Sequence, residues 1–68
     1  MVSKEIMESF IGKTIASERL YGSEWKKFTA RLVKIVGDEA LFILLDGRQS
    51  IAILSELRNV SEYREAVP

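Results

Sequence analysis

The residues best suited to chemistry in this 68-residue chain are cations that lie next to aromatic rings. Residues 13–34 contain six basic and two acidic side chains, although the whole chain has ten of each and a formal net charge of zero. Trp25 and Tyr21 lie close to Lys26 and Lys27 in this stretch. A single-stranded nucleic-acid surface needs cations that hold phosphates and aromatic rings on which bases stack. The alternative is a solvated strand face, with Trp25 buried in the core or at a subunit contact.

The composition excludes several kinds of active site. The chain has no Cys, which excludes disulfides and thiol nucleophiles, and no His, which excludes the usual zinc sites and His-based triads. Residues 12–14 read Gly-Lys-Thr, but Met7 stands where a phosphate-binding loop requires its first glycine. Asp38, Glu39 and Asp46 lack the spacing of a calcium loop. We therefore expect no catalysis, no cofactor and no metal.

The length predicts one small domain, residues 1–68. A domain of this size buries little surface to stabilise its fold. Domains of about 60 residues bury only about 60% of their unfolded surface, and natural ones compensate with disulfides, metals or self-association. Self-association is the route that this composition leaves, so we expect a homo-oligomer. The longest apolar run covers residues 40–45, against the roughly 20 residues of a spanning helix. No apolar signal core follows Met1, and we expect a cytoplasmic protein without a membrane partner.

The residue pattern predicts a short helix followed by strands. Ser3 can cap a helix over residues 4–11, and Gly12 is a typical stop. The remaining pattern predicts five short antiparallel strands at 14–20, 25–36, 40–45, 51–54 and 60–63, with one helical turn at 55–59. The residues Asp46-Gly47 are a strong hairpin signal between the third and fourth strands.

The longest strand changes its apolar face part-way along. Phe28, Ala30 and Leu32 share one face, whereas Val33 and Ile35 lie on the other. This slip predicts a bulge or sharp bend of the kind that closes small barrels. Residues 40–45 are apolar on both faces, which predicts a strand covered on both sides. The expected core consists of Leu32, Leu41, Ile43, Ile51 and Ile53, roofed by Ile6 and Phe10.

Together these elements predict a mainly β fold, a strongly bent five-stranded antiparallel barrel of the SH3-like or Sm-like kind. Residues 38–51, Asp-Glu-Ala-Leu-Phe-Ile-Leu-Leu-Asp-Gly-Arg-Gln-Ser-Ile, resemble the central hairpin of the Sm-like (LSm and Hfq-type) family. The order of a helix, a bent second strand, an apolar third strand, a tight turn and a short fourth strand is similar across nearly the whole chain.

The resemblance implies a cyclic homo-oligomer that binds RNA, in which strand four of one subunit pairs with strand five of the next. Asp38 matches the Asp that the family carries after strand two. Leu54-Ser55 stands in place of the Lys-His pair of Hfq-type proteins, and Ser55-Glu56 in place of the Arg-Gly of Sm proteins. The Asn that the Sm type uses on bases is replaced by an apolar residue near Leu41 or Phe42.

The resulting hypothesis is a ring-forming, non-catalytic protein that binds RNA or single-stranded DNA. We expect Trp25 to stack on bases and Lys26, Lys27, Arg31 and Lys34 to hold phosphates. Arg48, Arg58 and Asn59 are candidates nearer the pore of the ring, and the resemblance adds Asp38 to the site. The alternative function is a small barrel used for protein interaction or assembly, which the neutral net charge and the missing loop cations favour.

Overall fold

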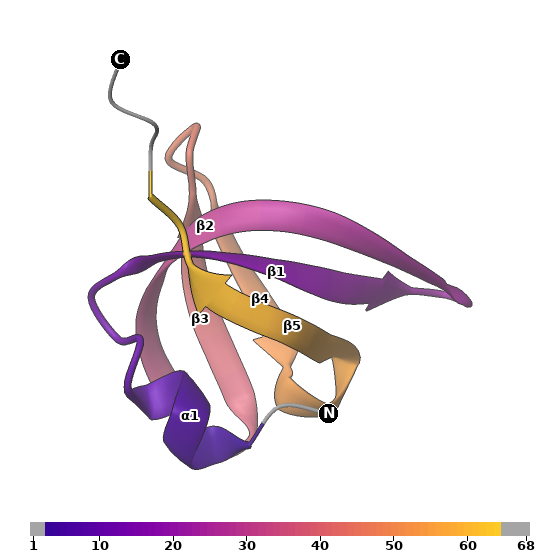
Figure 1. The fold of residues 1–68 in the computed structure, drawn as a ribbon, viewed down its shortest axis with the longest axis horizontal. Helices are drawn as coiled ribbons and strands as arrows, with labels where there is room; N and C mark the ends of the chain where they lie inside the picture. Colours follow the sequence, from indigo (N-terminus) through magenta and orange to yellow (C-terminus); the bar gives the residue numbers. More distant parts are fainter. Residues whose placement is uncertain (1–2, 65–68) are drawn as a thin grey trace.

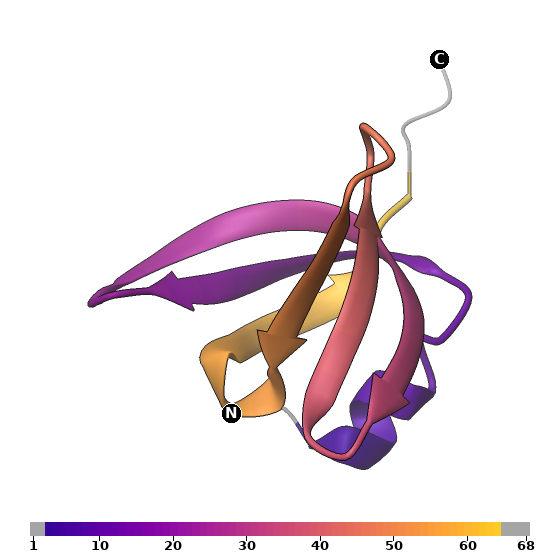
Figure 2. The same ribbon diagram turned by 180° about the vertical axis from the view of Figure 1, so that it is seen from behind.

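The computed structural model describes residues 3–64, which form a short helix followed by one curved antiparallel sheet (Figure 1 and Figure 2). The elements are α1 (Lys4–Glu8), β1 (Thr14–Tyr21), β2 (Glu24–Val36), β3 (Glu39–Leu44), β4 (Gln49–Ile53), the 3₁₀ turn η1 (Leu54–Glu56) and β5 (Leu57–Glu62). The strand order is β4-β3-β2-β1-β5. The predicted mainly β fold and the order of its elements are confirmed, but the helical turn predicted at 55–59 is wrong, because it ends at Glu56 and β5 already begins at Leu57. Residues 1, 2 and 65–68 of the predicted domain lie outside the described residues.

The helix is shorter than the predicted range of 4–11. Its start is as expected, because the Ser3 side chain accepts a hydrogen bond from the Ile6 amide at 3.2 Å. After Glu8 the backbone tightens into turns, and the Phe10 amide bonds to the Met7 carbonyl three residues back. Gly12 then adopts a φ of 87°, which favours glycine, and turns the chain into β1. One buried side chain, Met7, anchors this helix in the core.

Strand β2 contains the predicted irregularity. Leu32 pairs with Phe42, whereas Lys34 pairs with Leu41, so Val33 is an extra residue on β2. A bulge of this kind bends the strand and increases its twist. It also returns Ile35 to the face that packs against the core. The slip in the apolar pattern therefore marked a real bulge.

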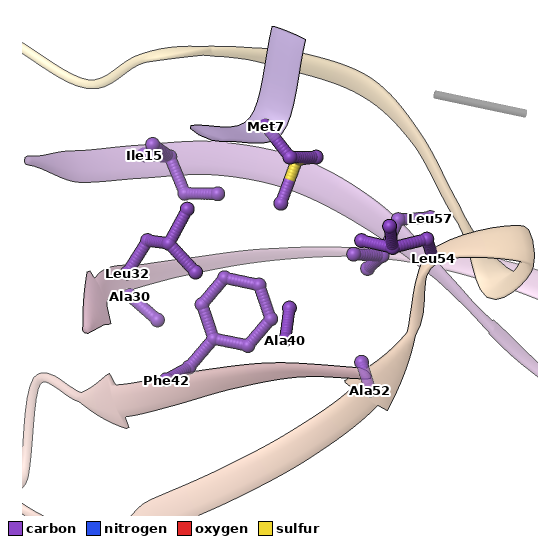
Figure 3. Close-up of a cluster of buried hydrophobic side chains, with 9 residues drawn as sticks. All are labelled: Met7, Ile15, Ala30, Leu32, Ala40, Phe42, Ala52, Leu54 and Leu57. Carbon is purple, nitrogen blue, oxygen red and sulfur yellow. The ribbon is translucent and has the colours of Figure 1, made fainter. Parts of the chain in front are cut away.

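The core lies on the inner side of the curved sheet, and Figure 3 shows Met7 pointing into it from α1. Phe42 is its largest side chain, and its ring meets that of Phe28 edge to face with centroids 5.4 Å apart. The buried apolar residues are Met7, Ile15, Ala30, Leu32, Ala40, Phe42, Ala52, Leu54 and Leu57. Three of these are alanines, which leave room for the Phe42 ring between the strands.

The predicted facing of β3 and β4 is wrong by one residue. Phe42 is buried, whereas Ile43 is exposed, and β3 is covered on one face rather than two. On β4 the small Ala52 faces inward, whereas Ile51 and Ile53 face outward. Of the residues expected in or over the core, Leu32 is buried, Phe10 packs against it, Leu41 is half-buried, and Ile6 is exposed. A one-residue shift exchanges the two faces of a strand, which explains these errors together.

Two strands are left at the edges of the sheet. β4 and β5 do not pair with each other within the chain, and β1 and β2 run on together as a hairpin that projects beyond the other strands (Figure 1). Arg19 of β1 reaches the edge of β4, where Nη1 donates to Ser50 Oγ at 2.9 Å and Nη2 donates to the Ile51 carbonyl at 2.7 Å. This side chain therefore bridges the opening between β1 and β4.

Candidate functional site

Four of the nine predicted site residues meet on the outer face of β5, β1 and β2. Antiparallel pairing places Lys27 of β2 opposite Glu18 of β1, and Glu18 opposite Arg58 of β5. Trp25 lies two residues before Lys27, and Asn59 follows Arg58. The sheet thus brings together residues that are more than 30 positions apart in the sequence.

Glu18 is the centre of this cluster, although the sequence analysis did not select it. Its Oε1 accepts hydrogen bonds from Arg58 Nε at 3.2 Å and Nη2 at 3.0 Å, and its Oε2 accepts one from Asn59 Nδ2 at 2.6 Å. The Asn59 hydrogen bond, followed by those from Arg58, lowers the pKa of the Glu18 carboxyl below its ordinary value. Glu18 therefore stays ionised and neutralises Arg58. Its partners are 40 and 41 positions away, which no local sequence pattern reveals.

The Arg58 guanidinium also covers the indole of Trp25. Its Cζ lies 4.2 Å from the ring centroid, within the range of a cation–π contact. Arg58 is thus bound to a carboxylate and to an aromatic ring at once. A nucleic-acid base that stacks on Trp25 has to use the other face of the indole or displace the guanidinium.

Asn59 has a backbone role in this cluster. It adopts a φ of 54°, and among residues 3–64 it is the one non-glycine residue with a positive φ. The pairing of β1 with β5 shifts register between Ala16 and Glu18, next to this position. Asn tolerates left-handed backbone better than most residues, so it suits a β-bulge. The same bulge presents its side chain to Glu18.

Two further residues of β2, Arg31 and Lys34, extend the cluster into a stripe of positive charge. Alternation along the strand puts Trp25, Lys27 and Arg31 on the outer face, and the bulge at Val33 keeps Lys34 on that face as well. Lys27, Arg31 and Lys34 are exposed. None of the three takes part in an ion pair with another residue of the described range 3–64. We call these four residues, Trp25, Lys27, Arg31 and Lys34, the β2 stripe.

The other three predicted site residues lie elsewhere. Lys26 is on the opposite face of β2, where its Nζ lies 5.8 Å from the ring centroid of Tyr21. Asp38 is in the turn between β2 and β3, and its carbonyl accepts a hydrogen bond from the Leu54 amide. Arg48 is in the turn between β3 and β4, where its Nε donates to Asp46 Oδ2 at 2.6 Å. This turn is at the other end of β4 from Arg58, so the two cations do not form one site.

A shallow hollow of about 350 Å³ lies beside the cluster on the outer side of the sheet. Glu18, Lys27 and Asn59 line one part of it, and the hydroxyl-bearing residues Thr29, Ser61 and Tyr63 line another. The hollow is open to solvent, and its lining is more apolar than polar, with Ala16 and Phe28 among its walls. Its walls can accept hydrogen bonds from a ligand or donate them to it.

A second surface is apolar and lies over β3 and β4. Ile43, Ile51 and Ile53 are 36%, 55% and 42% exposed, and Val36 at the end of β2 is 65% exposed. With the half-buried Leu41, these residues form what we call the outer β3–β4 face. A groove of about 270 Å³ lies on it, and its lining includes the exposed Lys34 and Glu39. Sequence reasoning missed this surface because it placed the same isoleucines in the core.

Within residues 3–64, no helix is long and apolar enough to cross a membrane. The same range contains no group of three or more acidic side chains placed to hold a metal ion. No protein-family model, curated protein or solved structure matches this chain. The arguments for function therefore rest on the geometry of its own residues.

Proposed function

We propose that this protein binds RNA or single-stranded DNA without catalysis, along the outer face of β2. The observation that carries the proposal is the β2 stripe, in which one strand presents an aromatic ring and three exposed cations in a line. An extended strand repeats its outward side chains about every 6–7 Å, which suits the regular spacing of a phosphodiester backbone. Stacking on an aromatic ring adds about 1–3 kcal/mol per base in proteins of this type.

The electrostatics of the neighbouring residues support binding of an anion. Glu18 is the carboxylate opposite Lys27, and its charge is balanced by Arg58. On the other side of the stripe, Arg31 faces Ile43 and Lys34 faces Leu41, both uncharged. The stripe is therefore more positive than the zero net charge of the chain suggests.

Self-association would strengthen such a weak patch. Copies of the stripe around one assembly bind a polyanion multivalently, and avidity can raise affinity by roughly 10²–10⁴ without a new contact. The ring implied by the Sm-like resemblance stays a prediction. It requires β4 of one copy to pair with β5 of the next, along the edge of β4 at which Arg19 binds the Ile51 carbonyl.

Lys26 and Lys27 provide a matched test, because these sequence neighbours lie on opposite faces of β2. The experiment measures binding of a fluorescent single-stranded oligonucleotide over a range of salt concentrations. Lys27→Gln should weaken binding to any sequence and reduce the slope of log affinity against log salt by about 0.7, as expected for one lost phosphate contact. Lys26→Gln should leave both quantities close to those of the parent. Equal effects of the two variants would contradict a site on the outer face.

The second candidate function is an assembly or protein-interaction module without a nucleic-acid role. The exposed isoleucines of the outer β3–β4 face favour it, because large apolar patches on small proteins commonly mark interaction sites. Negligible affinity for single strands even at low salt would decide for this candidate.

A further inference from the structure

The way β4 distributes its side chains is unusual for a strand of a small protein. Alanine 52 faces the core, whereas Ile51 and Ile53 face solvent on either side of it. A chain of this size can bury only a small core, and here it leaves two large apolar side chains outside. β3 does the same with Ile43. Exposure of these side chains is costly in a single chain, and a surface that covered them would remove this cost.

We propose that the outer β3–β4 face packs against the same face of a second copy of this chain, in a two-fold symmetric dimer. A stable interface buries about 800 Å² on each partner, which is about one sixth of the 4793 Å² that this chain exposes. Two apolar sheet faces pack well against each other at a separation of about 10 Å. This dimer goes beyond nucleic-acid binding and does not depend on it.

The charges at the rim identify the occupant as a second copy. The lining of the groove on this face includes one cation, Lys34, and one anion, Glu39. Neither forms an ion pair with another residue in the range 3–64. In a two-fold interface, residue i of one copy contacts residue j of the other and the reverse. A two-fold axis that passes between these two side chains places Lys34 of each copy near the partner's Glu39, and each of the two ion pairs then neutralises its charges.

The dimer also uses a surface that the hydrogen bonds of the chain leave available. It covers the outward side chains of Leu41, Ile43 and Ile51 and does not involve the edge of β4, where Arg19 binds the Ile51 carbonyl. A ring made by edge pairing would bring a second strand to that same carbonyl. The face-to-face arrangement keeps the bond from Arg19.

Ile51 and Ile6 provide a matched pair of variants for the first test, since their exposed fractions are 55% and 53% and only Ile51 lies on the proposed interface. Analytical ultracentrifugation without nucleic acid should give a mass of two chains for the parent and for Ile6→Lys at micromolar concentration. Ile51→Lys should sediment as a single chain with an unchanged far-ultraviolet circular dichroism spectrum. A parent that sediments as a single chain at 100 µM (about the concentration at which weak dimers form) would overturn the proposal.

A charge exchange tests the symmetry. Lys34→Glu gives a copy with two acids at the groove, and Glu39→Lys gives a copy with two bases. Each variant alone should dimerise about tenfold more weakly, because like charges then face each other across the axis. An equimolar mixture should recover the parental affinity as a heterodimer. No recovery in the mixture, or a mass above two chains that neither substitution changes, would show that another interface joins the copies. Lys34 also belongs to the β2 stripe, so both measurements are made without nucleic acid, and the Lys27→Gln test of the proposed function stands apart from them.

Discussion

At the scale of single residues, Glu18 holds the cluster together, and its charge state should control the docking of β5 onto β1. Since the pKa of its carboxyl is lowered in the folded protein, the folded form binds this proton less readily than the unfolded chain does. Its contribution to stability is therefore present above the ordinary pKa of 4.5 and is lost as the pH falls through the lower folded value.

The lowered pKa of Glu18 leads to a prediction for the Glu18→Gln variant. The variant cannot form the charge-assisted hydrogen bonds to Arg58, so its melting temperature should be below that of the parent at pH 7. The difference should shrink as the pH is lowered below 4.5, because the parental carboxyl then becomes neutral as well. Melting curves from pH 7 to pH 2.5 measure this effect. A difference that stays constant over the whole range would contradict a role for the ionised carboxylate.

Asn59 allows the backbone of the cluster to be tested separately from its side-chain bond. Asn59→Gly and Asn59→Val both remove the hydrogen bond to Glu18. Only valine resists a φ of 54°, at a cost of about 1–2 kcal/mol relative to glycine. We therefore expect the valine variant to be the less stable of the two by about that amount in chemical denaturation. Equal stabilities would mean that the bulge relaxes when Asn59 is replaced.

At the scale of elements, the facing of β3 can be tested with two neighbouring substitutions. Phe42→Ala should lower the free energy of unfolding by about 3–5 kcal/mol, because it empties the centre of the core. Ile43→Ala should cost less than about 1 kcal/mol in the isolated chain, since that side chain is on the outer face. Urea unfolding of both variants at a concentration where the chains are monomeric gives this comparison. The opposite order would restore the facing predicted from the sequence.

The sequence predicted the order of the elements well because turn residues and changes of period are local signals. Asp46-Gly47 marked the third hairpin turn, and the slip at Val33 marked the bulge in β2. The facing of β3 could not be predicted, because residues 40–45 are all apolar and either phase buries a hydrophobic face. On β4 the usual preference for burying the larger side chains gave the wrong prediction, because it placed Ile51 and Ile53 rather than Ala52 in the core. Ala30 and Ala52 share the core with Phe42 but come from β2 and β4, so the small side chains that suit a large ring there are brought together only by the fold.

In the candidate site, too, the local features could be predicted from the sequence and the long-range ones could not. Trp25 and Lys27 could be selected from composition, since cations beside an aromatic ring are visible in a short stretch. Alternation along a strand places Lys26 and Lys27 on opposite faces. The sequence analysis did not apply this rule to Lys26 and therefore kept it in the site. Glu18 and its bonds to Arg58 and Asn59 depend on the register between β1 and β5, which only the folded sheet provides.

At the scale of the whole molecule, Arg19 keeps the open side of the sheet from acting as a free edge. Arg19→Met removes two hydrogen bonds between β1 and β4, which we expect to lower the free energy of unfolding by about 1–3 kcal/mol. It also leaves the Ile51 carbonyl without its partner, which makes β4 a better template for pairing with another strand. The variant should therefore form larger oligomers than the parent in size-exclusion chromatography.

Arg48→Met is a suitable control for this experiment. It removes the same kind of side chain from the turn between β3 and β4, where the ion pair with Asp46 is exposed and its loss should be small. If Arg19→Met and Arg48→Met behave alike, the edge of β4 is protected by something other than Arg19.

The contact between Arg58 and Trp25 also gives the protein an optical reporter of its own. Trp25 is the one tryptophan in the chain, so all indole fluorescence comes from the place where β5 docks onto β1 and β2. Detachment of β5 would remove the guanidinium from the ring and expose the indole to water, changing its emission while the β2–β3 hairpin stays formed. Comparing this signal with circular dichroism during refolding would show whether the last strand joins the sheet in the same step as the others or later.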